Sequence, residues 1–141
     1  MKQIGLIATV LTMLTAPVVA QEIDLAGKIS VELNAVQTTE NNCTLTFFVI
    51  NGLDKQIDKA VYETVLFDKS GQVNRLTLFD FGTLPVARPR VRQFALPQVE
   101  CEQLGRVLFN GANTCEGEGL QDGICGTNIL PSSRTNIEVL G

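Results

Sequence analysis

Short runs of alternating apolar and polar residues, separated by turns, most narrowly limit the fold of this 141-residue chain. In residues 29–36, Ile29, Val31 and Leu33 fall on one face and polar residues on the other, which is the period of a half-buried β-strand. Similar runs follow at residues 43–50, 60–67, 73–81, 90–96, 106–110 and 134–140. The pattern predicts an all-β fold, an antiparallel immunoglobulin-like β-sandwich of about seven short strands, with a small barrel as the alternative.

One of these runs changes phase along its length. In residues 73–81 the apolar positions move from Leu76 and Leu78 to Phe79 and Phe81, so even-numbered positions give way to odd-numbered ones. A regular strand keeps its side-chain period of two, and an extra residue in one strand of a pair shifts that period. We therefore expect a β-bulge within this strand.

The first 20 residues have the organisation of a secretory signal peptide. Lys2 supplies a positive start, residues 4–14 form an apolar stretch, and the small residues Val18 and Ala20 precede the expected cleavage point. The apolar stretch is shorter than the roughly 20 residues that span a bilayer, which argues against a membrane anchor. The sequence thus predicts export to the periplasm or the exterior, with residues 21–141 forming one β-sandwich domain and no membrane span after cleavage.

Four cysteines remain in the exported part of the chain, at positions 43, 101, 115 and 125. An even number of cysteines in an exported domain predicts disulfides. The chain has no CxxC motif, which is the spacing that zinc binding or redox catalysis would need. If consecutive strands alternate in direction, Cys43 and Cys101 lie at one end of the sandwich and Cys115 and Cys125 at the other. We therefore predict the pairs Cys43–Cys101 and Cys115–Cys125, because bonded cysteines need Cα atoms within about 7 Å.

A glycine-rich loop is expected at residues 111–128, where the second disulfide would hold it together. Glu116, Glu118 and Asp122 lie in this loop and are weak candidates for calcium ligands, since calcium prefers carboxylate and carbonyl oxygens. The D-x-[DN]-x-[DN]-G pattern of a calcium loop is missing. A solvated loop without a metal is the simpler interpretation.

Composition excludes several classes of function. The chain has no histidine, so Ser-His-Asp triads, Cys-His dyads and histidine-based zinc sites are impossible. Its formal net charge of −4 disfavours nucleic acid as a partner. Glu63, Asp80 and the acidic residues of the 111–128 loop are the candidates for a carboxylate-based hydrolase, but nothing in their spacing places two of them across a cleft. We expect no enzyme activity and no cofactor.

Three arginines, Arg88, Arg90 and Arg92, follow one another at a spacing of two. In a strand this spacing directs all three side chains to one face, where they would bind an anion, an acidic glycan or an acidic protein. The alternative is an edge strand whose charges prevent pairing with other sheets. Pro89 lies in the same stretch and supports the edge.

Four segments of the chain resemble a family of small exported alphaproteobacterial proteins. They are LFDKSG (66–71), RLTLFDFGTLP (75–85), RVRQFALP (90–97) and CEQLGRVLFNG (101–111). The resemblance would cover nearly all of the exported chain. It implies export and a location in the cell envelope or outside the cell, and it carries over no activity.

These observations together predict an exported, non-enzymatic binding or structural module of the cell envelope or extracellular space. Its partner would be a protein or another envelope component. One alternative is an inhibitor that presents the 115–125 loop to a secreted enzyme, since a constrained loop loses less entropy on binding. Another alternative is an anion- or carbohydrate-binding module that uses the arginine row.

Overall fold

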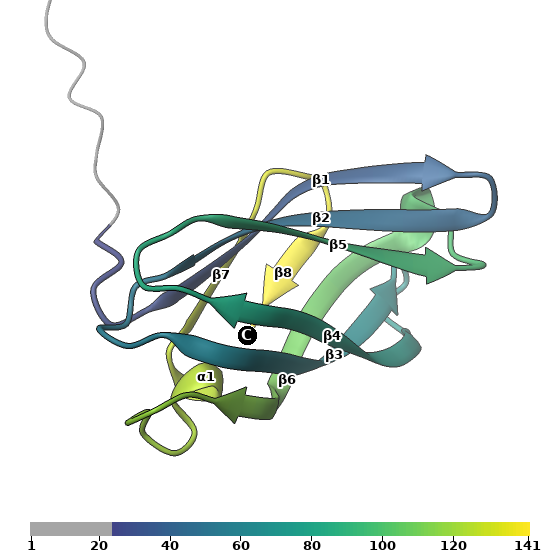
Figure 1. Ribbon diagram of the computed structural model, residues 1–141. Helices are drawn as coiled ribbons and strands as arrows, with labels where there is room; N and C mark the ends of the chain where they lie inside the picture. The colour runs from purple at the N-terminus through teal and green to yellow at the C-terminus, as the bar shows by residue number, and fades with distance from the viewer. Residues whose placement is uncertain (1–23) are drawn as a thin grey trace, which may run out of the picture.

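The computed structural model describes residues 24–141 (Figure 1). The predicted signal peptide, residues 1–20, lies outside this range. None of the helices within residues 24–141 has the length and apolarity that crossing a bilayer requires.

Strands dominate the described chain, with one 3-10 turn and one short helix between them. In order, the elements are β1 (Ile29–Thr39), β2 (Asn42–Asn51), β3 (Ile57–Asp68), β4 (Val73–Leu84), β5 (Arg90–Pro97), η1 (Cys101–Gln103), β6 (Leu104–Glu116), α1 (Ile124–Thr127), β7 (Ile129–Ser133) and β8 (Glu138–Leu140). The predicted all-β fold is confirmed at this level.

Two four-stranded sheets pack against each other, with the orders β5-β2-β1-β7 and β4-β3-β6-β8 (Figure 1). Six strands pair antiparallel, but β7 runs parallel to β1 and β8 runs parallel to β6. The expectation of a purely antiparallel sandwich is therefore wrong, and both sheets are mixed. The reason is that each strand reverses the direction of the strand before it along the chain. Strands separated by an even number of steps, such as β1 and β7 or β6 and β8, therefore run in the same direction and are parallel when they pair.

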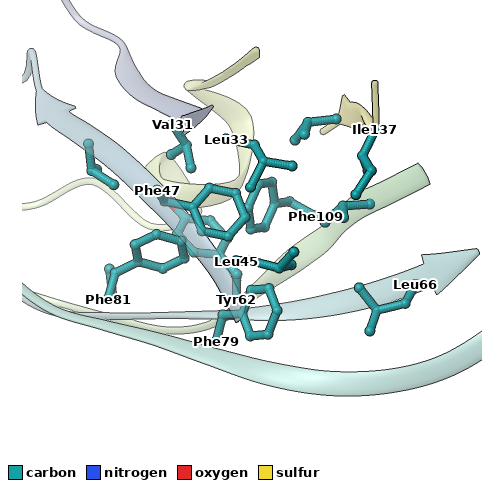
Figure 2. Close-up of a cluster of buried hydrophobic side chains, with 14 of the residues drawn as sticks. Val31, Leu33, Leu45, Phe47, Tyr62, Leu66, Phe79, Phe81, Phe109 and Ile137 are labelled. Atoms are coloured by element: carbon teal, nitrogen blue, oxygen red, sulfur yellow. The ribbon is translucent and has the colours of Figure 1, made fainter. Parts of the chain in front are cut away.

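Aromatic rings fill the space between the sheets (Figure 2). Strand β2 alternates as its sequence predicts, and its inward residue Phe47 is completely buried. The ring of Phe47 meets those of Phe79, Phe81, Phe94 and Phe109, with centroid distances between 5.7 and 6.0 Å. Tilted and edge-on contacts of this kind are favourable beyond the apolar area that they bury.

The phase change in β4 has a different cause from the expected one. The register between β3 and β4 is continuous from Arg75 to Asp80, and it shifts on both sides of this stretch, between Val73 and Arg75 and between Asp80 and Gly82. Phe79 and Phe81 are 2% and 0% exposed, whereas Leu76 and Leu78 are 61% and 53% exposed. Register shifts of the kind that a β-bulge produces therefore occur within β4, but not between Leu78 and Phe79, where the strand is regular and carries apolar side chains on both of its faces.

The glycine-rich region is more ordered than its sequence suggests. Strand β6 continues to Glu116, where it still pairs with Lys59 of β3, and α1 takes up Ile124–Thr127. Only residues 117–123 of the expected 111–128 loop are left as irregular chain before α1. The long partner strand β3 extends the pairing, which local glycine content does not reveal.

Two disulfides close the fold, and no free cysteine is present in residues 24–141. One joins Cys43 to Cys101 across 58 residues, and the other joins Cys115 to Cys125 across 10 residues. This is the pairing that alternating strand directions favour. Disulfides are typical of oxidising surroundings such as the periplasm or the extracellular space.

Candidate functional site

An apolar row crosses the solvent-exposed side of the sheet β4-β3-β6-β8. Leu76 pairs with Val65, Val65 pairs with Leu108, and Leu108 pairs with Leu140, so the four residues come from four neighbouring strands. Side chains of directly paired residues project to the same face of a sheet. Leu76 and Leu140 at the two ends of the row are 61% and 37% exposed, whereas Val65 between them is only 7% exposed and Leu108 is half-buried.

Further apolar side chains widen this row. Leu78 lies two residues along β4 from Leu76, and Val73 pairs with the half-buried Phe67 of β3. Val73 is 54% exposed. We call these residues together the apolar face: Phe67, Val73, Leu76 and Leu78 with Val65, Leu108 and Leu140.

Polar pairs border the apolar face. The Nε of Arg106 lies 2.6 Å from a carboxylate oxygen of Glu138, and the Nδ2 of Asn110 donates to Glu63 at 2.6 Å. A contiguous apolar patch with a polar rim is typical of an interaction site. The sequence contained the signal for this site, the phase change in residues 73–81, but a single strand does not show whether its second apolar face is covered.

The opposite side of the molecule lacks such a surface. On the outer face of the other sheet, Val91 is 56% exposed and pairs with the half-buried Phe48. The neighbour of Phe48 on its other side is Glu32, which ends the apolar stretch. The two outer faces therefore differ, and only that of β4-β3-β6-β8 carries an apolar row across all its strands.

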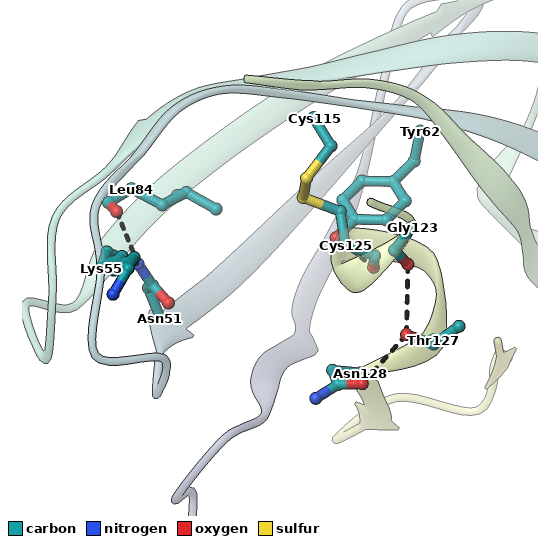
Figure 3. The surroundings of a disulfide bond; sticks show 9 residues. All are labelled: Asn51, Lys55, Tyr62, Leu84, Cys115, Gly123, Cys125, Thr127 and Asn128. Carbon is teal, nitrogen blue, oxygen red and sulfur yellow. Dashed lines mark hydrogen bonds between the residues drawn. A yellow bond between two sulfur atoms is a disulfide. The ribbon is translucent and has the colours of Figure 1, made fainter. Parts of the chain in front are cut away.

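A cavity of about 510 Å³ opens at the end of the sandwich that holds the second disulfide. Its lining comes from residues 26–27, 52–55 and 119–121, with Ile124 and Asn128. Figure 3 shows how α1 is held there: Cys115 bonds to Cys125, and the Tyr62 hydroxyl donates to the Cys125 carbonyl at 2.9 Å. Burial raises the pKa of Tyr62, so this hydroxyl stays protonated and continues to donate.

Asn51 holds the other side of this cavity (Figure 3). Its Nδ2 donates to the Leu84 carbonyl at 2.8 Å and to the Lys55 carbonyl at 2.9 Å, while its Oδ1 accepts from the Leu53 N–H at 3.0 Å. We expect Asn51→Ala to lower the free energy of unfolding by about 2–3 kcal/mol, because buried backbone groups lose their partners. Urea denaturation measures this, with the exposed Asn113→Ala as the control. Equal effects of the two substitutions would contradict the prediction.

The predicted arginine row does not form one exposed face. Arg88 is exposed in the segment before β5, whereas Arg90 and Arg92 are half-buried positions of β5 itself. Arg92 pairs with the buried Phe47, so its side chain starts on the inner side of the sheet. The three residues are therefore not brought together as a site on the outer face.

Arg92 and Arg75 instead join the edges of the two sheets. The guanidinium of Arg92 donates to the carbonyls of Phe81 and Thr83 in β4, at 2.6 and 3.0 Å. Arg75 of β4 donates to the carbonyl of Pro97 at 2.9 Å. These bonds occupy backbone acceptors at an open edge, which matches the edge-protecting interpretation of the charges.

The carboxylates singled out in the sequence are scattered. Glu116, Glu118 and Asp122 are exposed, and no group of three or more His, Cys, Asp or Glu residues within residues 24–141 is arranged to hold a metal ion. Glu63 accepts a hydrogen bond from a side chain, and Asp80 accepts one from the Gly82 N–H at 2.8 Å. None of these carboxylates is placed in the apolar face.

The geometry defines a class of protein: a nearly all-β chain of two packed four-stranded sheets, closed by two disulfides. Comparison with known protein families, with curated proteins and with solved structures finds no match for the chain in any of the three. The resemblance to small exported alphaproteobacterial proteins therefore stays a prediction.

Proposed function

We propose that this protein is an exported, non-enzymatic binding module that holds a partner protein against the apolar face. The observation that carries the proposal is the row Leu76, Val65, Leu108 and Leu140, which runs across four strands on the solvent side. Covering such a surface lowers the free energy of the system, in proportion to the apolar area that is removed from contact with water. The polar rim would then orient the partner.

Export is supported by two independent features. Residues 1–20 have the pattern of a secretory signal peptide, and both disulfides require oxidising surroundings to form and persist. We therefore place the module in the periplasm or outside the cell, where its partner would be a protein or another envelope component.

A non-enzymatic role is supported by the state of the reactive side chains. The cysteines are bonded to each other, and the single tyrosine is buried with a raised pKa. Glu63 and Asp80 already accept structural hydrogen bonds on an open sheet surface. General acid–base chemistry needs paired groups that converge on a bound substrate.

We also propose that the first six strands have an immunoglobulin-like order. The neighbours β1, β2 and β5 correspond to strands A, B and E of such a sandwich, and β4, β3 and β6 correspond to C′, C and F. The last two strands differ from that order. Where such a sandwich has a single antiparallel strand G, this chain has two short parallel strands, β7 in one sheet and β8 in the other. Immunoglobulin-like domains serve many functions, so this order supports a scaffold and not a particular activity.

Charged substitutions in the apolar face test the binding role. We expect Leu76→Glu/Leu78→Glu to weaken partner binding at least about tenfold, because a carboxylate in the interface must lose its water without gaining a partner. The matched control is Val91→Glu, at a similarly exposed position of the other sheet. A partner is captured from the periplasmic or culture fraction, and its affinity for each variant is measured by surface plasmon resonance.

The control outcome separates binding from folding. Leu76, Leu78 and Val91 are each more than half exposed, so the melting temperatures of the variants should stay close to that of the parent. Equal affinity of the parent and the double variant would overturn the proposal. Loss of the partner only with Cys115→Ser/Cys125→Ser would also overturn it, and would place binding at the loop held by that disulfide.

A further inference from the structure

The second half of β1 has a partner strand on one side only. Strand β2 pairs with β1 from Ile29 to Thr39, whereas β7 pairs with it only from Ile29 to Leu33. Over residues 34–39, no strand of the described chain pairs with the other edge. Figure 1 shows this part of β1 running beyond β7 along the margin of the molecule.

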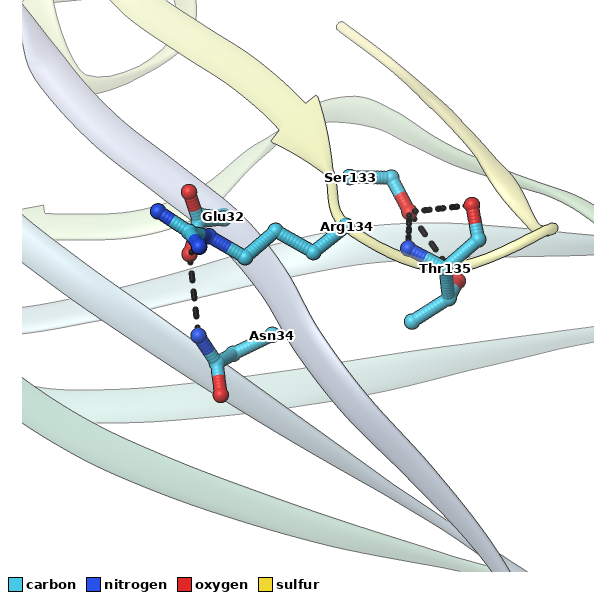
Figure 4. A network of polar contacts seen from close by, with 5 residues as sticks. All are labelled: Glu32, Asn34, Ser133, Arg134 and Thr135. Atoms are coloured by element: carbon cyan, nitrogen blue, oxygen red, sulfur yellow. Dashed lines mark hydrogen bonds and ion pairs between the residues drawn. The ribbon is translucent and has the colours of Figure 1, made fainter.

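A polar corner turns the chain away from β1 at this point (Figure 4). The Arg134 N–H donates to the Leu33 carbonyl at 2.9 Å, and the Arg134 Nε donates to Glu32 at 3.0 Å. The Ser133 hydroxyl accepts from the Thr135 N–H at 3.0 Å and so tightens the turn. The chain then crosses to the other sheet and forms β8, which leaves the line of β7 vacant beyond Ser133.

The edge strands β4, β5, β7 and β8 carry protective features. Arg92 and Arg75 bond across the open side between β5 and β4. Strand β7 contains Pro131, and β8 has only three residues. Residues 34–39 read NAVQTT, without a charge or a proline. Natural sheets usually protect their edges with charges, prolines, bulges or short strands, and of these features the stretch has only the bulge at Asn34.

The backbone groups that point to the open edge can be assigned from the register. The Leu33 carbonyl points to the β7 side, and Asn34 is the extra residue where the register shifts between Leu33 and Ala35. Successive residues in a strand present their backbone groups to alternate edges. The N–H and C=O groups of Val36 and Thr38 therefore point to the open edge.

A groove of about 400 Å³ lies beside this edge. The half-buried Val36 lines it together with the buried residues Leu104 and Ile137, and Lys69 and Arg134 line its polar part. An added strand would place alternate side chains in this groove and the others in solvent. Such pairing draws affinity from main-chain hydrogen bonds and specificity from the groove.

We propose that residues 34–39 of β1 bind an extended segment of another protein chain, which takes the line of β7 beyond Ser133. An extended backbone supplies both the donors and the acceptors that Val36 and Thr38 need. A second copy of this chain fits less well. In that second copy, β7 occupies the same edge of β1 over residues 29–33. Antiparallel pairing of the two β1 strands would therefore press the β7 of one copy against the turn after Thr39 of the other. This site is separate from the apolar face and does not depend on it.

A library of random dodecapeptides displayed on phage provides the probe, with the full exported chain in its disulfide-bonded form as the target. We expect the selected peptides to alternate apolar and polar residues. As synthetic peptides they should shift the amide resonances of residues 35–39 and slow hydrogen exchange at Val36 and Thr38. Isothermal titration calorimetry then gives the affinity for the parent and for each variant.

Two substitutions test the edge directly. Val36→Pro removes a donor at the open edge, and we expect it to weaken peptide binding by at least about tenfold, since proline is tolerated on edge strands but cannot donate. Gln37→Lys adds a charge beside the edge while leaving the core unchanged, and it should also weaken binding. Gln93→Lys on β5 is the matched control and should leave the affinity unchanged.

Several outcomes would overturn the proposal. They are unchanged affinity of the peptides for both Val36→Pro and Gln37→Lys, resonance shifts confined to the apolar face, or a selection that enriches no peptide. Sedimentation of the parent at rising concentration tests the other occupant. Self-association that Gln37→Lys abolishes would assign the edge to a second copy and would refute binding of a separate chain.

Discussion

Replacing Phe47 with alanine is expected to lower the free energy of unfolding by about 4 kcal/mol. The ring is completely buried, and four other aromatic rings surround it at centroid distances of 5.7 to 6.0 Å. The loss has two parts: the apolar surface that is no longer buried, and the cavity left between the two sheets. The surrounding rings come from β4, β5 and β6, so the cavity reaches elements of both sheets.

The matched control for Phe47 is its neighbour. Phe48→Ala removes the same ring from the same strand, but Phe48 is half-buried and points to the outer face. We expect Phe48→Ala to lower the free energy of unfolding by about 1 kcal/mol, since only part of the Phe48 side chain is buried in the folded protein. Guanidinium denaturation followed by circular dichroism measures both. Similar losses for the two variants would mean that the core is not centred on Phe47.

Removing the disulfide between Cys43 and Cys101 should also cost about 4 kcal/mol, because the released loop is long. The bond closes 58 residues, and releasing it gives the unfolded chain many more conformations. Cys43→Ala/Cys101→Ala is preferred to serine, because Cys43 and Cys101 are 0% and 8% exposed and a buried hydroxyl would add a separate cost.

Removing the second disulfide serves as the comparison for the first. The Cys115–Cys125 bond closes only 10 residues, so Cys115→Ala/Cys125→Ala should cost less, about 3 kcal/mol on the same loop-entropy estimate. Denaturant unfolding of the two double variants and the parent, with midpoints and slopes, measures the two losses of stability. A larger loss for the shorter loop would show that packing around Cys125, and not loop closure, is the main contribution of these bonds.

Part of the fold follows from residue order alone. The alternation in β2 predicts which residues face the core, because a strand must present successive side chains to opposite faces. The cysteine pairs follow from alternating strand directions, because reversal at each turn brings the start of β2 and the chain after β5 to the same end. Both inferences depend on local geometry that every strand shares.

The candidate site could not be predicted from the alternation of residues in the same way. Leu76 and Leu78 were visible as apolar residues out of phase with Phe79, and a bulge accounted for them without any exposed surface. The period of the arginine row was correct for Arg90 and Arg92, but the face they occupy was not. A period of two predicts that residues lie on the same face of a strand, but it does not predict which face is buried.

Residue order is enough to predict the strand content, the inward residues of strands such as β2 and the pairing of the cysteines, since each depends on period or chain direction. Residue order does not predict that the sheets are mixed, that β6 continues past its glycines to Glu116, or that β7 leaves β1 at Leu33. These features depend on which strands become neighbours, and neighbours far apart in sequence are set by how two sheets cover a shared core. The apolar face and the open edge of β1 belong to this second group, because a surface is exposed only where no other element comes to cover it.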